Sequence, residues 1–308
     1  MRSSKRKLWD RIIDHWQLYA FLSLPLIYII LFSYVPMGGL IMAFEKFDNR
    51  LGVIGSPWIG LENFTRFLTS YQFGRVLVNT ISLSFYGLIA GFPTPIIFAL
   101  ALNAVPSDKF KRFVQTVAYM PHFISTVVIV GLIMQLLNSR IGAYGVLFHA
   151  ITGENAPDLF AIASSFPHIY VWSGVWQGTG WGSIIYFAAL TSIDTELHEA
   201  AEIDGASRFQ RMIHIDLPCI LPTASIMLIL SAGNIMSVGF EKTFLMQNSI
   251  NLSKSEVIST YVYKVGIVTG GGDFSFGTAV GMFNSVVNFL MIITVNRICR
   301  GLGGTSLW

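Results

Sequence analysis

The sequence has few charged residues for its length. Asp, Glu, Lys and Arg make up 12% of the 308 residues, whereas hydrophobic residues make up 53%. Soluble domains carry about 25% charged residues, so this chain lacks the polar side chains that a water-facing surface needs. The deficit predicts an integral membrane protein whose main solvent is a lipid bilayer.

Sequence features of catalysis, metal binding and nucleic-acid binding are also missing. No G-x-x-x-x-G-K-[ST] loop, which would bind nucleotide phosphates, occurs in the sequence. The two cysteines, Cys219 and Cys299, have no metal-type spacing with histidine. The net charge is only +3, and the bases form no continuous stripe. We therefore expect a chain that is not an enzyme and that binds no metal, cofactor or nucleic acid of its own.

Six apolar segments are long enough to cross a bilayer, which takes about 20 residues of helix. They are residues 18–44, 76–104, 113–137, 167–190, 220–238 and 276–295. The fold class predicted is an all-α integral membrane protein with six transmembrane helices. The predicted organisation is a cytoplasmic segment at 1–17, a six-helix membrane domain at 18–298 containing a cytoplasmic loop at 193–219, and a cytoplasmic tail at 299–308.

The distribution of bases predicts the orientation of these spans. Lys and Arg gather on the cytoplasmic side of membrane proteins. With the N-terminus inside, 12 of the 20 bases fall in inner segments: Arg2, Lys5, Arg6, Lys7, Arg11, Lys109, Lys111, Arg112, Arg208, Arg211, Arg297 and Arg300. Both termini are therefore expected in the cytoplasm.

The most polar stretch, residues 194–218, predicts two short helices joined by a bend. Asp194 or Thr195 is a suitable N-cap for the first helix, and Gly205 suits the left-handed residue that ends it. Ser207 and Gln210 have the spacing of a capping box for the second. Leu217 and Pro218 are then expected to stop that helix before the fifth span re-enters the membrane.

The charge of this stretch is unusual for an inner loop. Six acids (Asp194, Glu196, Glu199, Glu202, Asp204 and Asp216) outnumber the two arginines. Small residues at positions 200 and 201 would let the helix backbone approach the walls of a groove. We therefore expect an exposed helix that binds in the cleft of a partner protein of complementary charge.

The spacing of the stretch resembles the EAA loop of permease subunits from binding-protein-dependent ABC importers. The matching positions are Glu199, Ala200, Ala201, Gly205, Ile215, Leu217 and Pro218. The segments WIGLENFTRF, NTISLS, ALALNAV, YMPHFIS and GTSLW extend the likeness over nearly the whole chain. They resemble six-span carbohydrate permeases of the maltose-importer type, most of all the polysaccharide or aldouronate-oligosaccharide branch.

This resemblance implies a type I ABC importer permease fold and import of oligosaccharides across the bacterial cytoplasmic membrane. It implies four partners in addition to the cargo: a second homologous permease, two ATPase subunits that bind the ATP and Mg, and an extracytoplasmic solute-binding protein. It also assigns coupling to the ATPase to Glu199, Ala200, Ala201, Asp204 and Gly205, with Leu217 and Pro218 holding the return of the chain.

Polar and aromatic side chains within the spans are candidates for the cargo pathway, because polar groups in a bilayer usually face protein or a wet cavity. The candidates are Trp172, Trp176, Gln177, Tyr186, Asn234, Asn284 and Asn288. Contact with lipid is an alternative for the tryptophans, and hydrogen bonds between helices are an alternative for the asparagines. The four-residue repeat of Gly174, Gly178 and Gly182 predicts a close-packing helix face.

Three other functions remain as alternatives. An ABC permease for an amino acid, peptide or ion would share the same coupling loop. An ion-coupled secondary transporter would need intramembrane charges and paired repeats, and the spans contain neither. A membrane-embedded enzyme would need clustered His, Asp or Glu at one membrane face, which the sequence also lacks.

Overall fold

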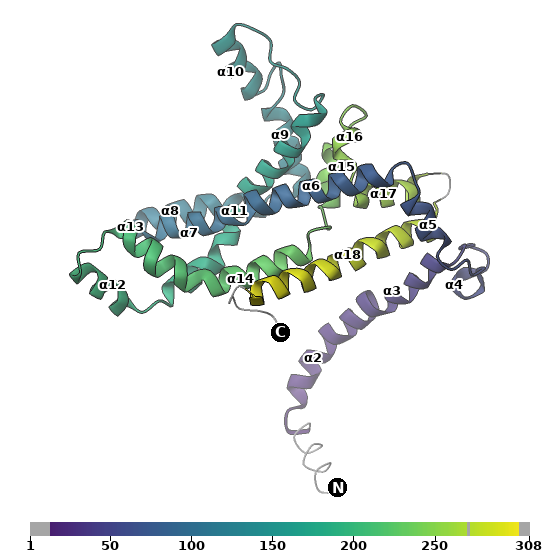
Figure 1. The fold of residues 1–308 in the computed structure, drawn as a ribbon, viewed down its shortest axis with the longest axis horizontal. Coiled ribbons are helices and arrows are strands. Elements are labelled where there is room, and N and C mark those ends of the chain that lie inside the picture. Colours follow the sequence, from purple (N-terminus) through teal and green to yellow (C-terminus); the bar gives the residue numbers. More distant parts are fainter. Residues whose placement is uncertain (1–12, 270–271, 302–308) are drawn as a thin grey trace. The chain divides into compact units, whose positions relative to one another are not determined.

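The structure is a computed structural model that describes residues 13–269 and 272–301 (Figure 1). All regular elements in these ranges are helical, and one antiparallel bridge joins Glu45 to Trp58. The chain forms two compact units, one of Met1–Phe67 with Val265–Met282 and one of Leu68–Lys264 with Phe283–Trp308. Most of the predicted N-terminal segment 1–17 and most of the predicted tail 299–308 lie outside the described residues.

The first unit contains the first predicted span. Its elements are α2 (Trp16–Ile29), η1 (Ile30–Tyr34), α3 (Val35–Met37), η2 (Gly38–Phe44), α4 (Gly52–Gly55), α5 (Glu62–Leu68), η6 (Lys264–Val268) and the start of α18 (Phe274–Gly301). Buried Asn63 donates hydrogen bonds from Nδ2 to the carbonyl oxygens of Ala43 (3.0 Å) and Glu45 (3.1 Å). These bonds fix the chain where it leaves η2.

The second unit is built around one long helix. Its elements are α6 (Phe73–Gly91), α7 (Pro93–Asn103), α8 (Asp108–Tyr119), η3 (Met120–Phe123), α9 (Thr126–Leu136), α10 (Ala143–Thr152), η4 (Ala163–Ser165), α11 (Phe166–Thr191), α12 (Thr195–Ile203), α13 (Arg208–Arg211), η5 (Met212–Asp216), α14 (Leu217–Gly233), α15 (Phe240–Met246), α16 (Leu252–Ser255), α17 (Ile258–Tyr263) and the rest of α18. α11 packs against α6, α7, α8 and α14. One hydrophobic cluster includes Val171 and another includes Tyr186, both from α11.

The contact of α11 with α8 depends on a glycine. A Cβ atom built on Gly180 would lie 2.1 Å from the carbonyl oxygen of Ala118. Any side chain at position 180 would therefore force the two helices apart, because such a contact is far inside van der Waals distance. Of the glycines predicted to form a close-packing face, Gly182 lies close to a neighbouring transmembrane helix, at Pro95 of α7, whereas Gly178 does not.

Among the described residues, four helical segments are long and apolar enough to cross a membrane: Trp16–Phe44, Phe73–Asn103, Arg208–Gly233 and Phe274–Gly301. The predicted third span at 113–137 is sharply bent, because Asp108–Phe123 and Thr126–Leu136 meet at 103°. Ser125 lies between them with an extended backbone and caps α9 by accepting a hydrogen bond from Val128 N. That cap starts a new helix in a new direction.

The predicted fourth span, α11, is long enough but is not among these four. Its tryptophans, glycines and Gln177 lower its hydropathy below that of the other rods. The finding is consistent with its central place, since a helix surrounded by other helices has less need of an apolar surface than one that faces lipid.

The predicted helix stop at Leu217–Pro218 is also wrong. α13, η5 and α14 run on as one rod from Arg208 to Gly233, and Leu217 is helical. Proline lacks an N–H and its ring clashes with the carbonyl four residues earlier. The π-helical turn η5 ends two residues before Pro218 and widens the rod there, as η1 does two residues before Pro36.

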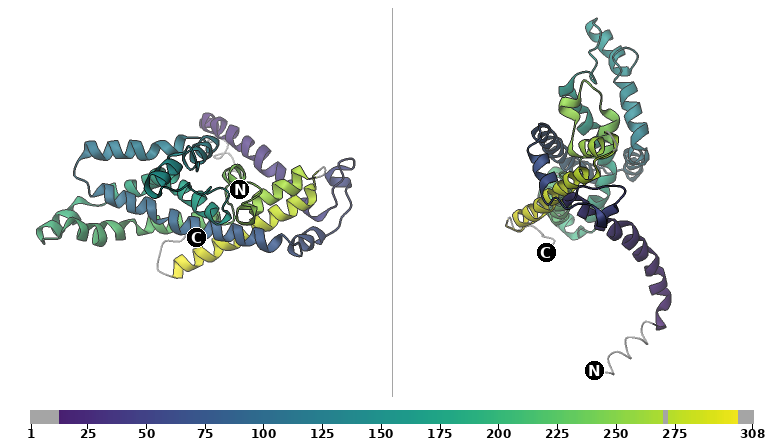
Figure 2. Two further views of the ribbon diagram at one scale, coloured as in Figure 1. Left: turned by 90° about the horizontal axis from the view of Figure 1, so that it is seen from above. Right: turned by 90° about the vertical axis from the view of Figure 1, so that its right-hand side faces the viewer.

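The ends of the last two spans also differ from the sequence prediction. The fifth was expected to reach residue 238, but α14 ends at Gly233 and residues 234–239 are not helical. The sixth, α18, is longer than expected at both ends. Within the second unit, α9 and α10 project away from α6, α7 and α11 (Figures 1 and 2).

Candidate functional site

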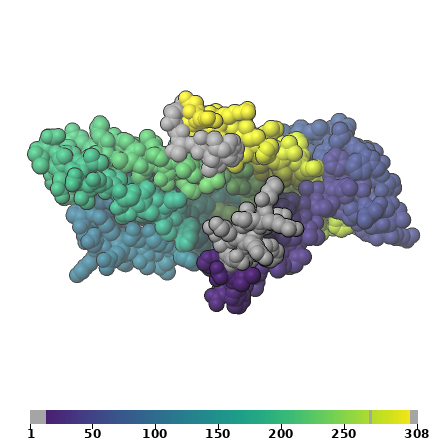
Figure 3. Space-filling view, turned by 90° about the horizontal axis from the view of Figure 1, so that it is seen from below, coloured from purple at the N-terminus to yellow at the C-terminus, as the bar shows by residue number. Residues whose placement is uncertain are grey.

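The candidate coupling segment, residues 194–216, forms one tip of the second unit. α12 lies at the end opposite α15, α16 and α17 (Figures 1 and 2). In the space-filling view its green atoms form the left-hand tip (Figure 3). No residue of α12 is buried. The segment is therefore open to contact from outside.

Local hydrogen bonds shape this segment as the sequence predicts. The Asp194 carboxylate caps α12 by accepting from Glu196 N at 3.0 Å. The helix ends at Gly205, whose φ is +81°, with Ala206 N donating to Ala201 O and Gly205 N donating to Glu202 O. This pair of bonds is the Schellman arrangement, which requires the left-handed residue.

The second helix begins with the predicted capping box. Ser207 Oγ accepts from Gln210 N at 3.3 Å, and Gln210 Oε1 accepts from Ser207 N at 2.8 Å. Caps at both sides of the bend leave little freedom for the angle between α12 and α13.

Two charge contacts join α12 to the following rod. Arg211 Nη1 donates to Glu202 Oε2 at 2.9 Å. His198 Nε2 lies 3.2 Å from Oδ1 of the buried Asp216, and this contact is an ion pair when His198 is protonated. A displacement of α12 would therefore be transmitted to α13 and η5, and along the same rod to α14.

The outward face of α12 carries an apolar group among acids. Ile203 is 87% exposed, Leu197 is exposed, and Glu199, Ala200 and Asp204 lie on the same short helix or its end. Ala201 is half-buried. An exposed isoleucine on a capped, acidic helix suits insertion into a groove of another protein. Further along the rod, Leu217 is half-buried and Pro218 is exposed.

A cavity of about 520 Å³ lies behind the segment. Its charged lining residues are Lys111, His198, Arg208, Arg211 and Asp216. The bases of this cavity lie beside a segment whose outer face is acidic.

A second cavity, of about 400 Å³, brings together two of the predicted pathway residues. Tyr186 from α11 and Asn234 from the end of α14 both line it. Residues 235 and 237–239 contribute to the wall with non-helical backbone. Non-helical backbone at membrane depth is tolerated only where it is buried in protein or lines a wet cavity. The lining thus offers backbone polar groups as well as an amide and a phenol.

The other candidates on α11 point elsewhere. Gln177 lines an adjoining cavity of about 470 Å³, and its Nε2 donates to Ile124 O at 3.3 Å. Trp172 Nε1 donates to the hydroxyl of Tyr86 at 2.9 Å. Trp176 lines an apolar cavity against α8. The two tryptophans are half-exposed in the isolated chain.

The two asparagines of α18 have different surroundings. Asn288 accepts from Met236 N at 2.8 Å and donates to Ser237 Oγ at 2.9 Å, so it anchors the non-helical stretch after α14. Asn284 has a buried Oδ1 without a hydrogen-bond partner among the described residues. Neither asparagine is brought into the cavity of Asn234.

Some cavity residues were missed by sequence reasoning. Ser237 and Gly239 line the Asn234 cavity, but the predicted fifth span ran through residue 237 and hid this turn. Lys242 lines the Gln177 cavity. The sequence signal that could have identified Lys242 is its position as a base four residues after the predicted fifth span. The repeat of Gly174, Gly178 and Gly182 lines that same cavity. Gly182 lies close to Pro95 of α7 and Gly174 lies close to Lys242 of α15, whereas Gly178 has open space beside it.

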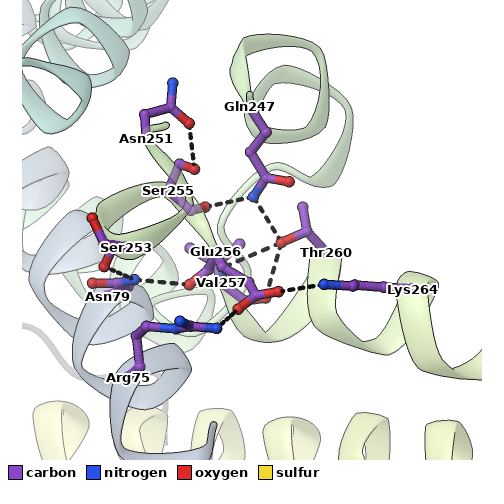
Figure 4. A network of polar contacts seen from close by, with 10 residues as sticks. All are labelled: Arg75, Asn79, Gln247, Asn251, Ser253, Ser255, Glu256, Val257, Thr260 and Lys264. Carbon is purple, nitrogen blue, oxygen red and sulfur yellow. Dashed lines mark hydrogen bonds and ion pairs between the residues drawn. The ribbon is translucent and has the colours of Figure 1, made fainter. Parts of the chain in front are cut away.

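A polar network holds the opposite end of the unit, where α6 meets α16 and α17 (Figure 4). Glu256, which is 2% exposed, forms ion pairs with Arg75 and Lys264. Asn79 Nδ2 donates to the carbonyl oxygens of Ser253 (3.1 Å) and Glu256 (3.0 Å). The contacts of Arg75 and Asn79 connect residues more than 170 positions apart, so they fix tertiary structure rather than local shape.

Known proteins resemble the chain over nearly its full length. Residues 91–302 match the family described as "Binding-protein-dependent transport system inner membrane component". The "Polygalacturonan/rhamnogalacturonan transport system permease protein YteP" of Bacillus subtilis is 38% identical over 100% of this chain and 95% of its own length. "Protein LplB" of the same organism is 40% identical over 93% and 89%.

A solved structure has the same fold. A chain from the "bacterial alginate ABC transporter in complex with alginate pentasaccharide-bound periplasmic protein" superposes with a TM-score of 0.87. It is 36% identical, and the match covers 98% of this chain and 100% of that one. The fold is thus that of an ABC transporter permease. The chain belongs to the family of binding-protein-dependent transport system inner membrane components.

Proposed function

We propose that this chain is a permease subunit of an ATP-driven, binding-protein-dependent importer of oligosaccharides. It crosses the bacterial cytoplasmic membrane six times, with both termini inside. The six crossings are the four apolar rods, the bent pair α8–α9 and the central helix α11. The chain itself is non-catalytic, and separate ATPase subunits bind ATP and Mg.

The observation that carries this proposal is the capped, exposed coupling segment. Its sequence has the spacing of the EAA loop, its bend is built on Gly205, and its outer face presents Ile203 without any intrachain cover. The contact with a motor protein must be rigid to transmit displacement. The contacts of Arg211 with Glu202 and of His198 with Asp216 make the coupling segment more rigid. Glu199, Ala200, Ala201, Asp204 and Gly205 are the proposed contact with the ATPase.

The proposed cargo is an oligosaccharide from a broken-down polysaccharide. Support comes from relatives whose names specify polygalacturonan, rhamnogalacturonan or alginate. Further support comes from the cavity itself, because the phenol of Tyr186 and the amide of Asn234 suit a ligand rich in hydroxyl groups. Tyr186 and Asn234 are the proposed cargo contacts, and Gln177 lies along the same path.

The proposed partners follow from the surfaces left open. A second homologous permease would cover apolar side chains of the spans, including Trp172 and Trp176. Two ATPases would bind the coupling segments of the pair. An extracytoplasmic binding protein would deliver cargo, and the solved alginate transporter supports this because it is in complex with a periplasmic protein that holds an alginate pentasaccharide.

Purification of the chain from its native membrane with gentle detergent tests the assembly. We expect a second permease and an ATPase to co-purify, and we expect oligosaccharide uptake into vesicles only with ATP and the binding protein present. Replacement of Ile203 by Asp should release the ATPase, while the same change at Ile54, a fully exposed isoleucine in α4, should not. Uptake of sugar by the chain without an ATPase, or uptake of amino acids but no sugar, would overturn the proposal.

A further inference from the structure

One base on the proposed outer side differs from the other seven. Arg66, Arg75 and Lys264 form ion pairs with acids, and Lys46, Arg50, Arg140 and Lys254 are exposed. Lys242 is half-buried, and no carboxylate of the described residues lies within 4.0 Å of its Nζ. A partly desolvated ammonium group without a counter-ion is costly. Its presence calls for an explanation.

The contacts of Lys242 are all with one turn of α11. Its Nζ donates to the carbonyl oxygen of Tyr170 at 2.9 Å and lies 5.0 Å from the centre of the Tyr170 ring. It lies 3.3 Å from the position that a Cβ on Gly174 would occupy. An ammonium group has three N–H donors. The protein therefore uses one donor and leaves two for another partner.

The free donors belong to a cavity of ligand size. Lys242 and Gln177 line the cavity of about 470 Å³, and the glycines of α11 form one of its walls. Its residues Gly87, Gly91, Pro95, Tyr170 and Gly182 also line the Asn234 cavity of about 400 Å³. The two cavities therefore adjoin along α6, α7 and α11. Ligand pockets have volumes of about 300–1,000 Å³.

We propose that Lys242 is a specificity-determining residue that binds a carboxylate group of the cargo, so that the importer carries oligosaccharides containing acidic sugars. This inference rests on the proposed function. A uronate carboxylate would give the ammonium its missing counter-ion and two charge-assisted hydrogen bonds. The sugar ring beside it would meet the flat wall of glycines and the Tyr170 ring. Burial lowers the pKa of Lys242 to about 8, and a bound carboxylate would offset that cost.

A purely structural role for Lys242 makes a different prediction. As a tether between α15 and α11, Lys242 would support transport of any cargo equally. As a carboxylate ligand, it would affect acidic cargo alone. The ratio of acidic to neutral transport therefore separates the two roles, whereas total activity would not.

The test uses the complete importer in vesicles with its binding protein. The probes are a set of uronate tetrasaccharides as free acids, their methyl esters and neutral tetrasaccharides of equal size. We expect Lys242→Met to lower uptake of the free acids about 10- to 100-fold, the range for a hydrogen bond to a charged group, with neutral uptake unchanged. Lys242→Arg should restore most of the acid uptake. Lys254→Met removes an exposed charge from the same side and is the matched control.

Each outcome bears on a different claim. Loss of acid uptake alone, restored by Arg, supports the carboxylate site. Equal loss for all sugars, or no change for any, overturns it while leaving an oligosaccharide importer in place. Uptake of neutral sugars only by the unmodified importer also overturns it. Uptake of no sugar at all would instead overturn the proposed function.

Discussion

The two ends of the second unit carry polar groups in opposite arrangements. At the coupling segment, the acids of α12 are exposed, and the segment is held by caps and contacts within about two helical turns of sequence. At the α6–α16–α17 end, Glu256 and Asn251 are buried and bonded to distant or fully enclosed partners (Figure 4). The first arrangement leaves a surface free for another protein. The second arrangement uses its polar groups for contacts within the chain, which stabilise its tertiary structure.

The difference matters for transport because a permease needs both a contact surface that is displaced by its partner and a framework that keeps its structure during that displacement. Exposed ion pairs contribute about 0–1 kcal/mol, so the coupling segment keeps its shape mainly through backbone caps. A buried carboxylate, by contrast, must be paired to be tolerated. Mutations at the two ends should therefore separate stability from coupling.

The largest effect is expected at Glu256. Replacement by Gln keeps the shape but removes the charge that pairs with Arg75 and Lys264. We expect the folded state to lose about 1–3 kcal/mol, since Arg75 is left with a poorly satisfied charge. The thermal unfolding midpoint in detergent measures the loss. Glu202→Gln, which breaks the exposed pair with Arg211, is the control and should shift the midpoint little.

A smaller stability effect with a large functional consequence is expected at Gly205. A Cβ there would meet no atom within 4 Å, so Val would be disfavoured by the positive φ alone, at about 1–2 kcal/mol. Val should uncouple ATP hydrolysis from uptake, whereas Asn, which tolerates this conformation, should be milder. Gly153 ends α10 with φ +74° and equally open space. If Gly153→Val uncoupled transport as strongly, the effect would not belong to the coupling segment.

Asn234 should show a moderate effect on cargo alone. Its Nδ2 makes only a 3.4 Å contact with Leu230 O, so Leu at this position should cost little stability. Loss of one neutral hydrogen bond to the cargo, about 0.5–1.5 kcal/mol, should raise the half-saturating cargo concentration several-fold. Asn284→Leu, at a buried oxygen outside the cavity, is the comparison. Unaltered uptake kinetics in Asn234→Leu would remove it from the pathway.

The smallest expected effect is a pH dependence of acidic cargo uptake. The Lys242 ammonium attracts a carboxylate only while it is protonated, and its pKa is lowered to about 8, so uptake of acids relative to neutral sugars should fall as pH rises through about 8. The titratable groups on elements packed against α15 are His168, Tyr170 and Tyr186 of α11 and Tyr261 and Tyr263 of α17, with Glu241 on α15 itself. Lys242→Arg should keep the ratio constant to higher pH, which distinguishes this site from other groups in the importer.

Local features were predictable from the sequence where neighbours in the chain supply the bonds. The Asp194 cap, the left-handed Gly205 and the Ser207–Gln210 capping box all match the prediction. The failures have two causes. The rod continues through Pro218 because a π turn, which the sequence pattern does not reveal, precedes the proline. The stretch after α14 is held by a distant residue, Asn288, through its bond with Met236 N.

Composition and short-range spacing alone determined that this is a helical membrane protein with a capped, acidic stretch at residues 194–216, because hydropathy and helix caps act within a few residues. Only the tertiary structure decided that Tyr186 and Asn234 share a cavity, that Gly180, outside the glycine repeat, permits the close approach of α11 to α8, and that Lys242 lies in the adjoining cavity with no carboxylate of the described residues within 4.0 Å. Those facts depend on which distant helices meet. Side-chain packing and burial depend on contacts between residues that are distant in the sequence, so a sequence pattern does not reveal them.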